Sequence, residues 1–349
     1  MLKILKYLLL FLILLNVVYA FVGAYFYPLA SIDAIGIWLL KAKFFYLSGG
    51  FPLEFLKNTT FIYSHPHYPL LLPFIFSIFY FLLGGVKESL IVFIYPLTFI
   101  IVLFFIYKLL REFGFTQIIA LIFTYIYSMF SPLLAQAGRK HAGEADIFIL
   151  LANLLVVFIT LKMFKDKQRN LGTFLVMLII MIASQIKLEG IFIIATLVFM
   201  PIPKKTKLIA GIISLIPFLI WNFTAFYLHL PNDFYFLIPP LQEIFMRIFA
   251  IVGYVLFEMI KLNNWFIFWP VFLLSIVLIK TKNIFLRKFV IPSFLVISAL
   301  YFCVYVFSSI NPAAYVSSSI DRVLIQISPY FFLWFALLIK EMLPKKLSQ

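Results

Sequence analysis

Residues 144–164 read EADIFILLANLLVVFITLKMF, an almost uninterrupted apolar run. A helix needs about 20 predominantly apolar residues to cross a bilayer, and this stretch has that length. The whole chain shares its character: of 349 residues, 65% are hydrophobic and 12% are charged, and the mean hydropathy is +1.12. Soluble domains carry about 45–50% apolar and about 25% charged residues. The composition, with one cysteine, excludes an ordinary soluble protein, a disordered chain and a disulfide-built scaffold. It predicts an all-α polytopic membrane protein.

Twelve apolar runs predict the helices of a single domain, 1–349. They cover residues 4–26, 69–84, 88–107, 115–137, 144–164, 171–186, 189–202, 207–228, 243–260, 265–280, 288–308 and 319–340. We expect about ten transmembrane helices (10–12), because ten crossings place all basic clusters on one side. The runs 69–84 and 243–260 are expected at the outer interface, or half-inserted. The first run resembles a signal peptide but stays apolar beyond Ala20, so we expect an uncleaved span.

The charge pattern predicts the orientation. The chain has 28 Lys and Arg against 13 Asp and Glu, a formal charge of +15. Basic clusters gather on the cytoplasmic side of membrane proteins, so both termini are expected there. No basic tract is long enough to follow a phosphate backbone, and we therefore exclude nucleic acid as a partner. The acids and histidines expected outside are Asp33, Glu54, Glu88, Glu144, Asp146, Glu189, Asp233, Glu243, Glu258, Asp321, His65, His67, His141 and His229. They are either solvated loop residues or parts of one site at the outer surface.

The first outer loop, about residues 27–87, holds the first candidates. Trp38, Lys41 and Phe45 have the spacing of a short amphipathic helix lying along the membrane surface, with Asp33 near its start. Asp33 can be a helix cap that accepts backbone N–H bonds. It can also be a base or metal ligand whose basicity is raised by partial desolvation.

The loop ends in residues 63–73, YSHPHYPLLLP, where prolines restrict the turn that carries His65, His67 and Tyr68. Two histidines alone do not make a metal site. Aromatic side chains are also common anchors at the headgroup boundary. Between these alternatives we favour hydrogen bonding of the three side chains to a lipid phosphate or a sugar.

A second group precedes the helix expected over 144–164. Arg139 and Lys140 lie on the outer side, against the positive-inside pattern, which favours a local role such as anion binding. Glu144 and Asp146 follow at the start of the helix, where its dipole alone already favours negative charge.

Two cationic positions occur later. Lys187 lies with Glu189 in a tight outer turn, where the two side chains either pair with each other or place a lysine beside a lipid phosphate. Arg322 opens the last run. It either extends to lipid headgroups or binds a donor phosphate through two hydrogen bonds.

In their order along the chain, these segments resemble the GT-C-type membrane glycosyltransferases, such as protein O-mannosyltransferases and lipid-A aminoarabinose transferases. The matching segments are Ile32-Asp33-Ala34 with Trp38-x-x-Lys41-Ala42-Lys43, His65-Pro66-His67-Tyr68-Pro69, Gly143-Glu144-Ala145-Asp146, Ile186-Lys187-Leu188-Glu189-Gly190 and Asp321-Arg322. The resemblance extends from the first run to about residue 200 and is weaker beyond. Asp33 is followed by alanine where mannosyltransferases commonly have Asp-Glu, and we expect no soluble domain after Lys340.

The resemblance implies a GT-C-like bundle with interfacial helices in the first outer loop. It implies an inverting enzyme that moves a sugar from a polyprenyl-phosphate donor to a lipid, glycan or protein acceptor on the extracytoplasmic face of a prokaryotic plasma membrane. Asp33 would be the catalytic base. The ligands of the donor phosphate and sugar would be His65, His67, Tyr68, Arg139, Lys140, Lys187 and Arg322. The second acids would be Glu144, Asp146 and Glu189.

Two alternatives stay open. One is a divalent cation such as Mg or Mn, for which Asp33 and Asp146 are the candidate ligands. The other is a lipid or polysaccharide flippase or transporter. Transporters commonly place charges near the membrane midplane between repeated halves. Here the charges lie at helix ends and no internal repeat is evident, which favours the transferase.

Overall fold

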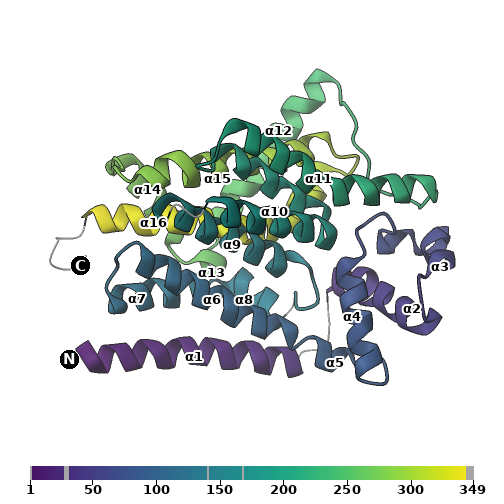
Figure 1. The fold of residues 1–349 in the computed structure, drawn as a ribbon, viewed down its shortest axis with the longest axis horizontal. Helices are drawn as coiled ribbons and strands as arrows, with labels where there is room; N and C mark the ends of the chain where they lie inside the picture. Colours follow the sequence, from purple (N-terminus) through teal and green to yellow (C-terminus); the bar gives the residue numbers. More distant parts are fainter. Residues whose placement is uncertain (1, 27–30, 140, 167–168, 343–349) are drawn as a thin grey trace.

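The computed structural model describes residues 2–26, 31–139, 141–166 and 169–342, and nearly all of this part of the chain is helical (Figure 1). The elements are α1 (Leu2–Phe26), η1 (Ala34–Leu39), α2 (Leu40–Ser48), α3 (Leu53–Lys57), η2 (Thr59–Ser64), α4 (Leu71–Leu82), α5 (Glu88–Ile91), α6 (Ile94–Glu112), α7 (Gln117–Ser128), α8 (Ser131–Gly138), α9 (Asp146–Lys165), α10 (Arg169–Ile186), η3 (Leu188–Phe199), α11 (Lys204–Tyr227), α12 (Leu241–Met259), α13 (Leu262–Trp265), α14 (Phe268–Leu278), η4 (Leu286–Val290), α15 (Ile291–Phe307) and α16 (Pro312–Met342). Within these residues the extended backbone forms only an isolated bridge, between Phe236 and Ser308. The all-α class is confirmed.

Seven helical stretches of the described chain are long and apolar enough to cross a membrane. They are Leu2–Phe26, Glu88–Glu112, Asp146–Lys165, Arg169–Ile186, Lys204–Tyr227, Leu286–Phe307 and Pro312–Met342. An eighth forms if α7 and α8, which are bent by 72° relative to each other, make one span. Pro132 in the first turn of α8 accounts for the bend, because proline has no amide hydrogen to continue the α7 helix. The chain is therefore a multi-pass integral membrane protein.

Fewer helices reach spanning length than the ten expected. Residues 189–202 form the 12-residue 3₁₀ helix η3, and residues 265–280 form the 11-residue helix α14 after a break at Phe266. Run 69–84 forms the 12-residue helix α4, in keeping with its exclusion from the spans. Run 243–260 contains Arg247, Gly253 and Glu258, which we expect from the sequence to interrupt it; instead it forms one 19-residue helix, α12.

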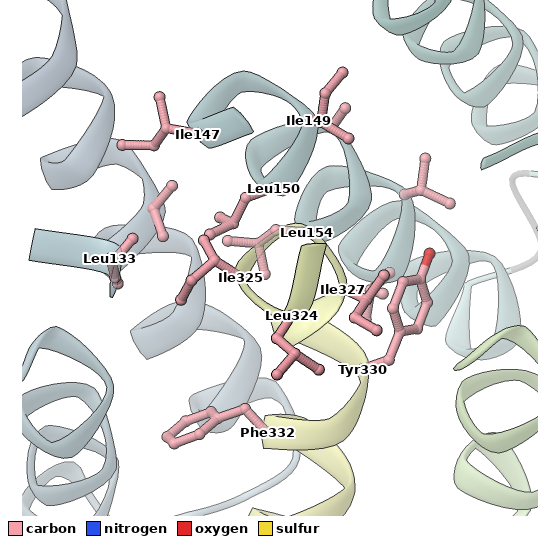
Figure 2. Packing of buried hydrophobic residues seen from close by; sticks show 14 of the residues in the cluster. Leu133, Ile147, Ile149, Leu150, Leu154, Leu324, Ile325, Ile327, Tyr330 and Phe332 are labelled. Carbon is pink, nitrogen blue, oxygen red and sulfur yellow. The ribbon is translucent and has the colours of Figure 1, made fainter. Parts of the chain in front are cut away.

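The centre of the bundle is α16, which packs along α9. Of its candidate span, 83% is buried inside the protein. Figure 2 shows Ile325 of α16 beside Leu150 and Leu154 of α9, and Phe332 further along α16. Lipid tails are as apolar as leucine, so such contacts stabilise the bundle through close packing rather than through exclusion of water. Because α16 is central and buried, its N-terminal part, with Arg322, lies in the middle of the site described below.

Helix α1 is held against α8 by a close backbone approach. A Cβ atom at Gly138 would lie 1.8 Å from the carbonyl oxygen of Ala20, and one at Gly23 would lie 2.3 Å from the carbonyl oxygen of Gly138. Small residues at such crossings let membrane helices approach closely. The contact fixes α1 beside the segment that leads into α9, so the first loop starts next to the residues around Glu144.

The first outer loop differs from the expectation of a helix lying on the membrane surface. Trp38, Lys41 and Phe45 have exposed fractions of 2%, 0% and 7%. They face the protein because α2 packs against α4. Asp33 precedes η1 but makes no side-chain cap hydrogen bond, so its carboxylate is available for other partners.

The two ends of the bundle differ in their charged groups. Helix α1 begins and α16 ends at the left of Figure 1. At that end Lys162 and Lys165 pair with Glu112, at 2.7 and 2.9 Å. The first-loop helices α2 and α3 lie at the opposite end (Figure 1). Both ends of the described chain lie at the same end of the bundle, in keeping with the predicted topology. The acid-rich segments lie at the opposite end.

Candidate functional site

A polar cavity of about 200 Å³ lies at the acid-rich end of the bundle. Its walls come from segments far apart in the sequence: the first loop, the start of α9, the turn after α10, the C-terminal end of α15 and the N-terminal part of α16. The charged side chains that line it are Asp33, Asp146, Lys187, Glu189 and Arg322. His65 and Tyr68 also line it, so the structure brings together seven of the residues that the sequence singled out.

Arg322 connects the carboxylates of this cavity. Its Nη1 atom donates a hydrogen bond to Asp33 Oδ2 and lies 3.2 Å from Glu144 Oε2. The same atom lies 3.9 Å from Asp146 Oδ2. Buried charges are stable only when they are paired and hydrogen-bonded, and one guanidinium here serves three acids. Its Nε atom is buried and has no partner within the described part of the chain.

Lys187 forms the second cationic centre. Its Nζ atom lies 2.9 Å from Asp146 Oδ1 and 3.5 Å from Glu189 Oε1. Burial alone would lower the pKa of Lys187, but the charges of Asp146 and Glu189 outweigh it and raise the pKa well above its ordinary value. Lys187 is thus a cation at neutral pH. The Oε2 atom of Glu189 is buried and accepts no hydrogen bond from the described residues.

The three acids around Arg322 differ in access. The side chains of Glu144 and Asp146 are 2% and 1% exposed, whereas that of Asp33 is 36% exposed. Glu144 also accepts hydrogen bonds from Ser31, from Gln136 at 2.8 Å and from His141 at 2.8 Å. Glu144 is therefore saturated with partners, and Asp33 is the most exposed acid of this group.

His141 supports Glu144 from the loop before α9. Burial alone would lower the pKa of His141, but the hydrogen bond and charge of Glu144 outweigh it, and the pKa of His141 is raised. Protonated His141 strengthens its bond to the carboxylate. This contact helps to fix the acid that in turn positions Arg322.

The turn that carries His65, His67 and Tyr68 forms another wall. His65 stacks on Tyr68, with ring centroids 4.7 Å apart, and its Nδ1 atom lies 2.7 Å from Asp233 Oδ1. Burial raises the pKa of Tyr68, which therefore keeps its proton. The Nε2 atom of His67 lies 3.2 Å from Oδ1 of Asn222 in α11, and burial lowers the pKa of His67.

A second, more apolar cavity of about 410 Å³ adjoins the polar one between η3, α11 and α15. It is lined by His67 and by apolar side chains such as Ile191, Phe192 and Phe218. The two cavities share the residues Tyr68, Glu189, Phe234, Val304 and Tyr315. The arrangement thus joins a charged chamber to an apolar one.

Arg139 lies away from both cavities. Its guanidinium carbon is 5.5 Å from the ring centroid of Tyr19 in α1, a cation–π contact. The close packing of Gly138 on α1 turns the following residue toward that helix. The expected phosphate ligand Lys140 lies outside the described residues.

The candidate metal ligands face cations of the protein itself. Asp33 and Asp146 both approach the guanidinium of Arg322, and Asp146 also binds Lys187. In the described ranges, no group of three or more His, Cys, Asp or Glu side chains is arranged to hold a metal ion. The carboxylates therefore have resident organic cations as partners.

Sequence reasoning missed several residues of the site. Gln326 lies one helical turn after Arg322, donates to Asp146 and accepts from the hydroxyl of Tyr301. Tyr305 lies one turn after Tyr301, lines the polar cavity and bonds Ser319 at 2.8 Å. The tyrosines occur four residues apart in an apolar run, and Gln326 is an isolated polar residue in another. Those two features were the available signals.

No protein-family model, no curated protein and no solved structure matches this chain.

Proposed function

We propose that the protein is an inverting glycosyltransferase. Its donor is a sugar linked to a polyprenyl phosphate, and its acceptor is a hydroxyl compound on the extracytoplasmic face of the membrane. The observation that carries the proposal is that the two cavities are adjacent and share part of their walls. A polyprenyl-phosphate sugar has a charged head and a long apolar chain, and it matches a charged chamber that adjoins an apolar one.

Asp33 is the proposed general base. It accepts the proton of the acceptor hydroxyl while that oxygen bonds to the anomeric carbon and the bond between this carbon and the phosphate oxygen breaks. Its 36% exposed side chain supports this role, because the neighbouring acids Glu144 and Asp146 are enclosed. The prenyl phosphate leaves with the electron pair of the broken bond.

Arg322 and Lys187 are the proposed electrophilic groups. Negative charge grows on the leaving phosphate in the transition state, and fixed cations in an enclosed site stabilise it most when they are already oriented. The contacts of Arg322 with Asp33 and Glu144, and of Lys187 with Asp146, supply that orientation. The Tyr68 hydroxyl, which keeps its proton, is a further donor on the wall that both cavities share.

Donor binding tests the proposal first. The purified protein in lipid nanodiscs is heated with undecaprenyl-phosphate sugars (glucose, mannose, N-acetylglucosamine and 4-amino-arabinose), and with undecaprenol as a control that lacks the phosphate. At least one phosphate-linked sugar is expected to raise the Tm of the wild-type protein by several degrees, and undecaprenol is not. The same Tm with every compound would contradict the proposal.

A further inference from the structure

Lys41 is a fully buried lysine that the proposed chemistry does not use. Its exposed fraction is 0%, and it takes part in no ion pair within the described ranges. The acid whose charge acts on it, Asp233, already pairs with His65. Its Nζ atom lies 5.9 and 5.6 Å from the ring centroids of Trp38 and Tyr68. The buried ammonium group therefore has two aromatic rings and one backbone carbonyl oxygen, that of His65, as its neighbours.

A buried, unpaired lysine weakens a fold. The free energy needed to remove an ammonium group from water is comparable with the whole stability of a domain. Lys43, two residues later in the same helix, shows the ordinary arrangement: it is 32% exposed and pairs with Glu88 at 2.8 Å. Ionisable groups whose burial is this unfavourable cluster at functional sites. The hydrogen-bond acceptor of the Lys41 amine is therefore a candidate for a functional part of the protein.

The amine holds the carbonyl oxygen that closes a turn. Lys41 Nζ donates to the carbonyl oxygen of His65 at 2.6 Å, and the amide of Tyr68 donates to the same oxygen at 2.8 Å. His65 has a φ of 48°, a left-handed conformation that is strained for a residue with a side chain. Such a conformation persists only where the surroundings enforce it. Lys41 supplies one of those restraints from behind the turn.

The same turn forms part of the wall of both cavities. His65 and Tyr68 line the polar cavity, and His67 and Tyr68 line the apolar one. The indole Nε1 of Trp221 holds the carbonyl oxygen of His67 at 2.8 Å from the α11 side. Opening of the turn would therefore move side chains that face both the head and the chain of a bound lipid.

We propose that Lys41 is a positioning residue: from outside the cavities, its amine holds the strained turn His65–Tyr68 in the conformation that places Tyr68 at the junction of the polar and apolar cavities. Its consequence for ligand binding rests on the proposed function, whereas its hold on the turn does not. The role belongs to the amine and the carbonyl oxygen it binds, so it is separable from the stability of the fold.

Hydrogen exchange of the Tyr68 amide tests this hold directly. The full-length protein in nanodiscs is compared as wild type, Lys41→Met and the matched control Lys43→Met. Exchange at Tyr68 is expected to be at least tenfold faster in Lys41→Met, with α9 and α16 unchanged and Lys43→Met like wild type. If Lys41→Met does not accumulate, Lys41→Gln replaces it, because its side chain is one atom too short to reach the carbonyl oxygen. Unchanged exchange at Tyr68 would overturn the proposal.

Two further readouts separate positioning from mere stabilisation. At pH 6, Lys41→Met is expected to have a Tm equal to or above that of wild type, because it removes a buried charge; a clear fall in Tm would overturn the positioning role. The Kd for undecaprenyl phosphate is expected to rise about tenfold, and an unchanged Kd would overturn the link to ligand binding. If wild type itself does not bind undecaprenyl phosphate, the proposed function fails, and the exchange experiment still decides the hold of Lys41 on the turn.

Discussion

The Nη1 atom of Arg322 lies 3.2 Å from Oε2 of Glu144, although 178 residues separate them in the chain. The same guanidinium nitrogen binds Asp33, which lies a further 111 residues before Glu144 (289 − 178). One side chain of α16 thus ties the first outer loop to the segment before α9. Because of this connection, the acids form one paired cluster rather than a set of separate, solvated loop residues.

Replacement of Arg322 by Gln should weaken both the fold and the site. The change leaves Asp33, Glu144 and Asp146 without their shared cation, and removing one partner of a buried ion pair costs about 3–5 kcal/mol. We expect a Tm lower by many degrees and no stabilisation by a polyprenyl-phosphate sugar. Arg139→Gln is the control, because Arg139 lines neither cavity and its guanidinium contacts the ring of Tyr19, a contact worth about 0.5–1 kcal/mol. Equal losses in the two variants would refute the bridging role.

Lys41 should make stability depend on pH in alkaline solution. Burial lowers its pKa from 10.5 to about 7, with the charge of Asp233 opposing the shift. The unfolded chain therefore binds more protons between these values, and stability rises as pH rises through them. The destabilisation by the buried charge is full below pH 7, where it amounts to about 5 kcal/mol, and it falls to about 1 kcal/mol at pH 9.5.

Thermal unfolding of wild type and Lys41→Met at pH 6 and pH 9.5 checks this dependence. The Tm advantage of the variant should be larger at pH 6, since only wild type carries the buried charge. Lys43→Met, which changes a partly exposed lysine that is paired with Glu88, should show no such difference between the two pH values. An advantage that grows toward pH 9.5 would have the wrong sign.

The apolar cavity should select for the chain of the donor. Ile191 lines this cavity and not the polar one, so Ile191→Trp fills space for the chain from a position outside the wall of the polar cavity. We expect stabilisation by a C55 donor to be lost and stabilisation by a C10 analogue with the same sugar to be kept. Loss of both, or of neither, would place the chain elsewhere.

The contact between α1 and α8 should not accept even a methyl group. Gly138→Ala puts a Cβ atom 1.8 Å from the Ala20 carbonyl oxygen, and relieving such overpacking costs about 1–3 kcal/mol. Gly211→Ala, in α11 with no atom within 4 Å of its Cβ position, should instead be neutral or stabilising by up to about 1 kcal/mol. Thermal unfolding of the two variants compares these outcomes, and similar Tm values would contradict the close approach.

The sequence was most informative about the membrane helices and the charged ends. Hydrophobic runs identify long membrane helices because a long apolar segment without charged residues is by itself a strong signal for a span. Lys187 and Asp146 were both recognisable, since charged residues next to apolar runs are rare, but their 2.9 Å pairing depends on how α9 and α10 pack. Local spacing failed for Trp38 and Lys41. The amphipathic pattern was real, but it faces α4 and the turn at His65 rather than lipid.

Other features required the fold. Run 189–202 has the composition of a span, yet it begins at Glu189 and Gly190 close to α10, where a Cβ atom on Gly190 would lie 2.2 Å from the Ala183 carbonyl oxygen. That contact forms only after the chain turns back. Arg139 was selected because it stands on the unexpected side of the membrane, but its partner is the ring of Tyr19. The charge pattern of the sequence does not distinguish an arginine that binds an anion from one that packs on an aromatic ring.

Turnover of a polyprenyl-phosphate sugar by the purified protein tests the central claim most directly. Wild type, Asp33→Asn and the control Glu54→Gln, an exposed acid of the same loop, are incubated in nanodiscs with radiolabelled donor and membrane extract as acceptor. Wild type and Glu54→Gln should release undecaprenyl phosphate and transfer the label. Asp33→Asn should be slower by a factor of about 10²–10⁴, with its Tm still raised by the donor. Equal turnover by Asp33→Asn would contradict the account, as would donor that crosses the bilayer without being consumed.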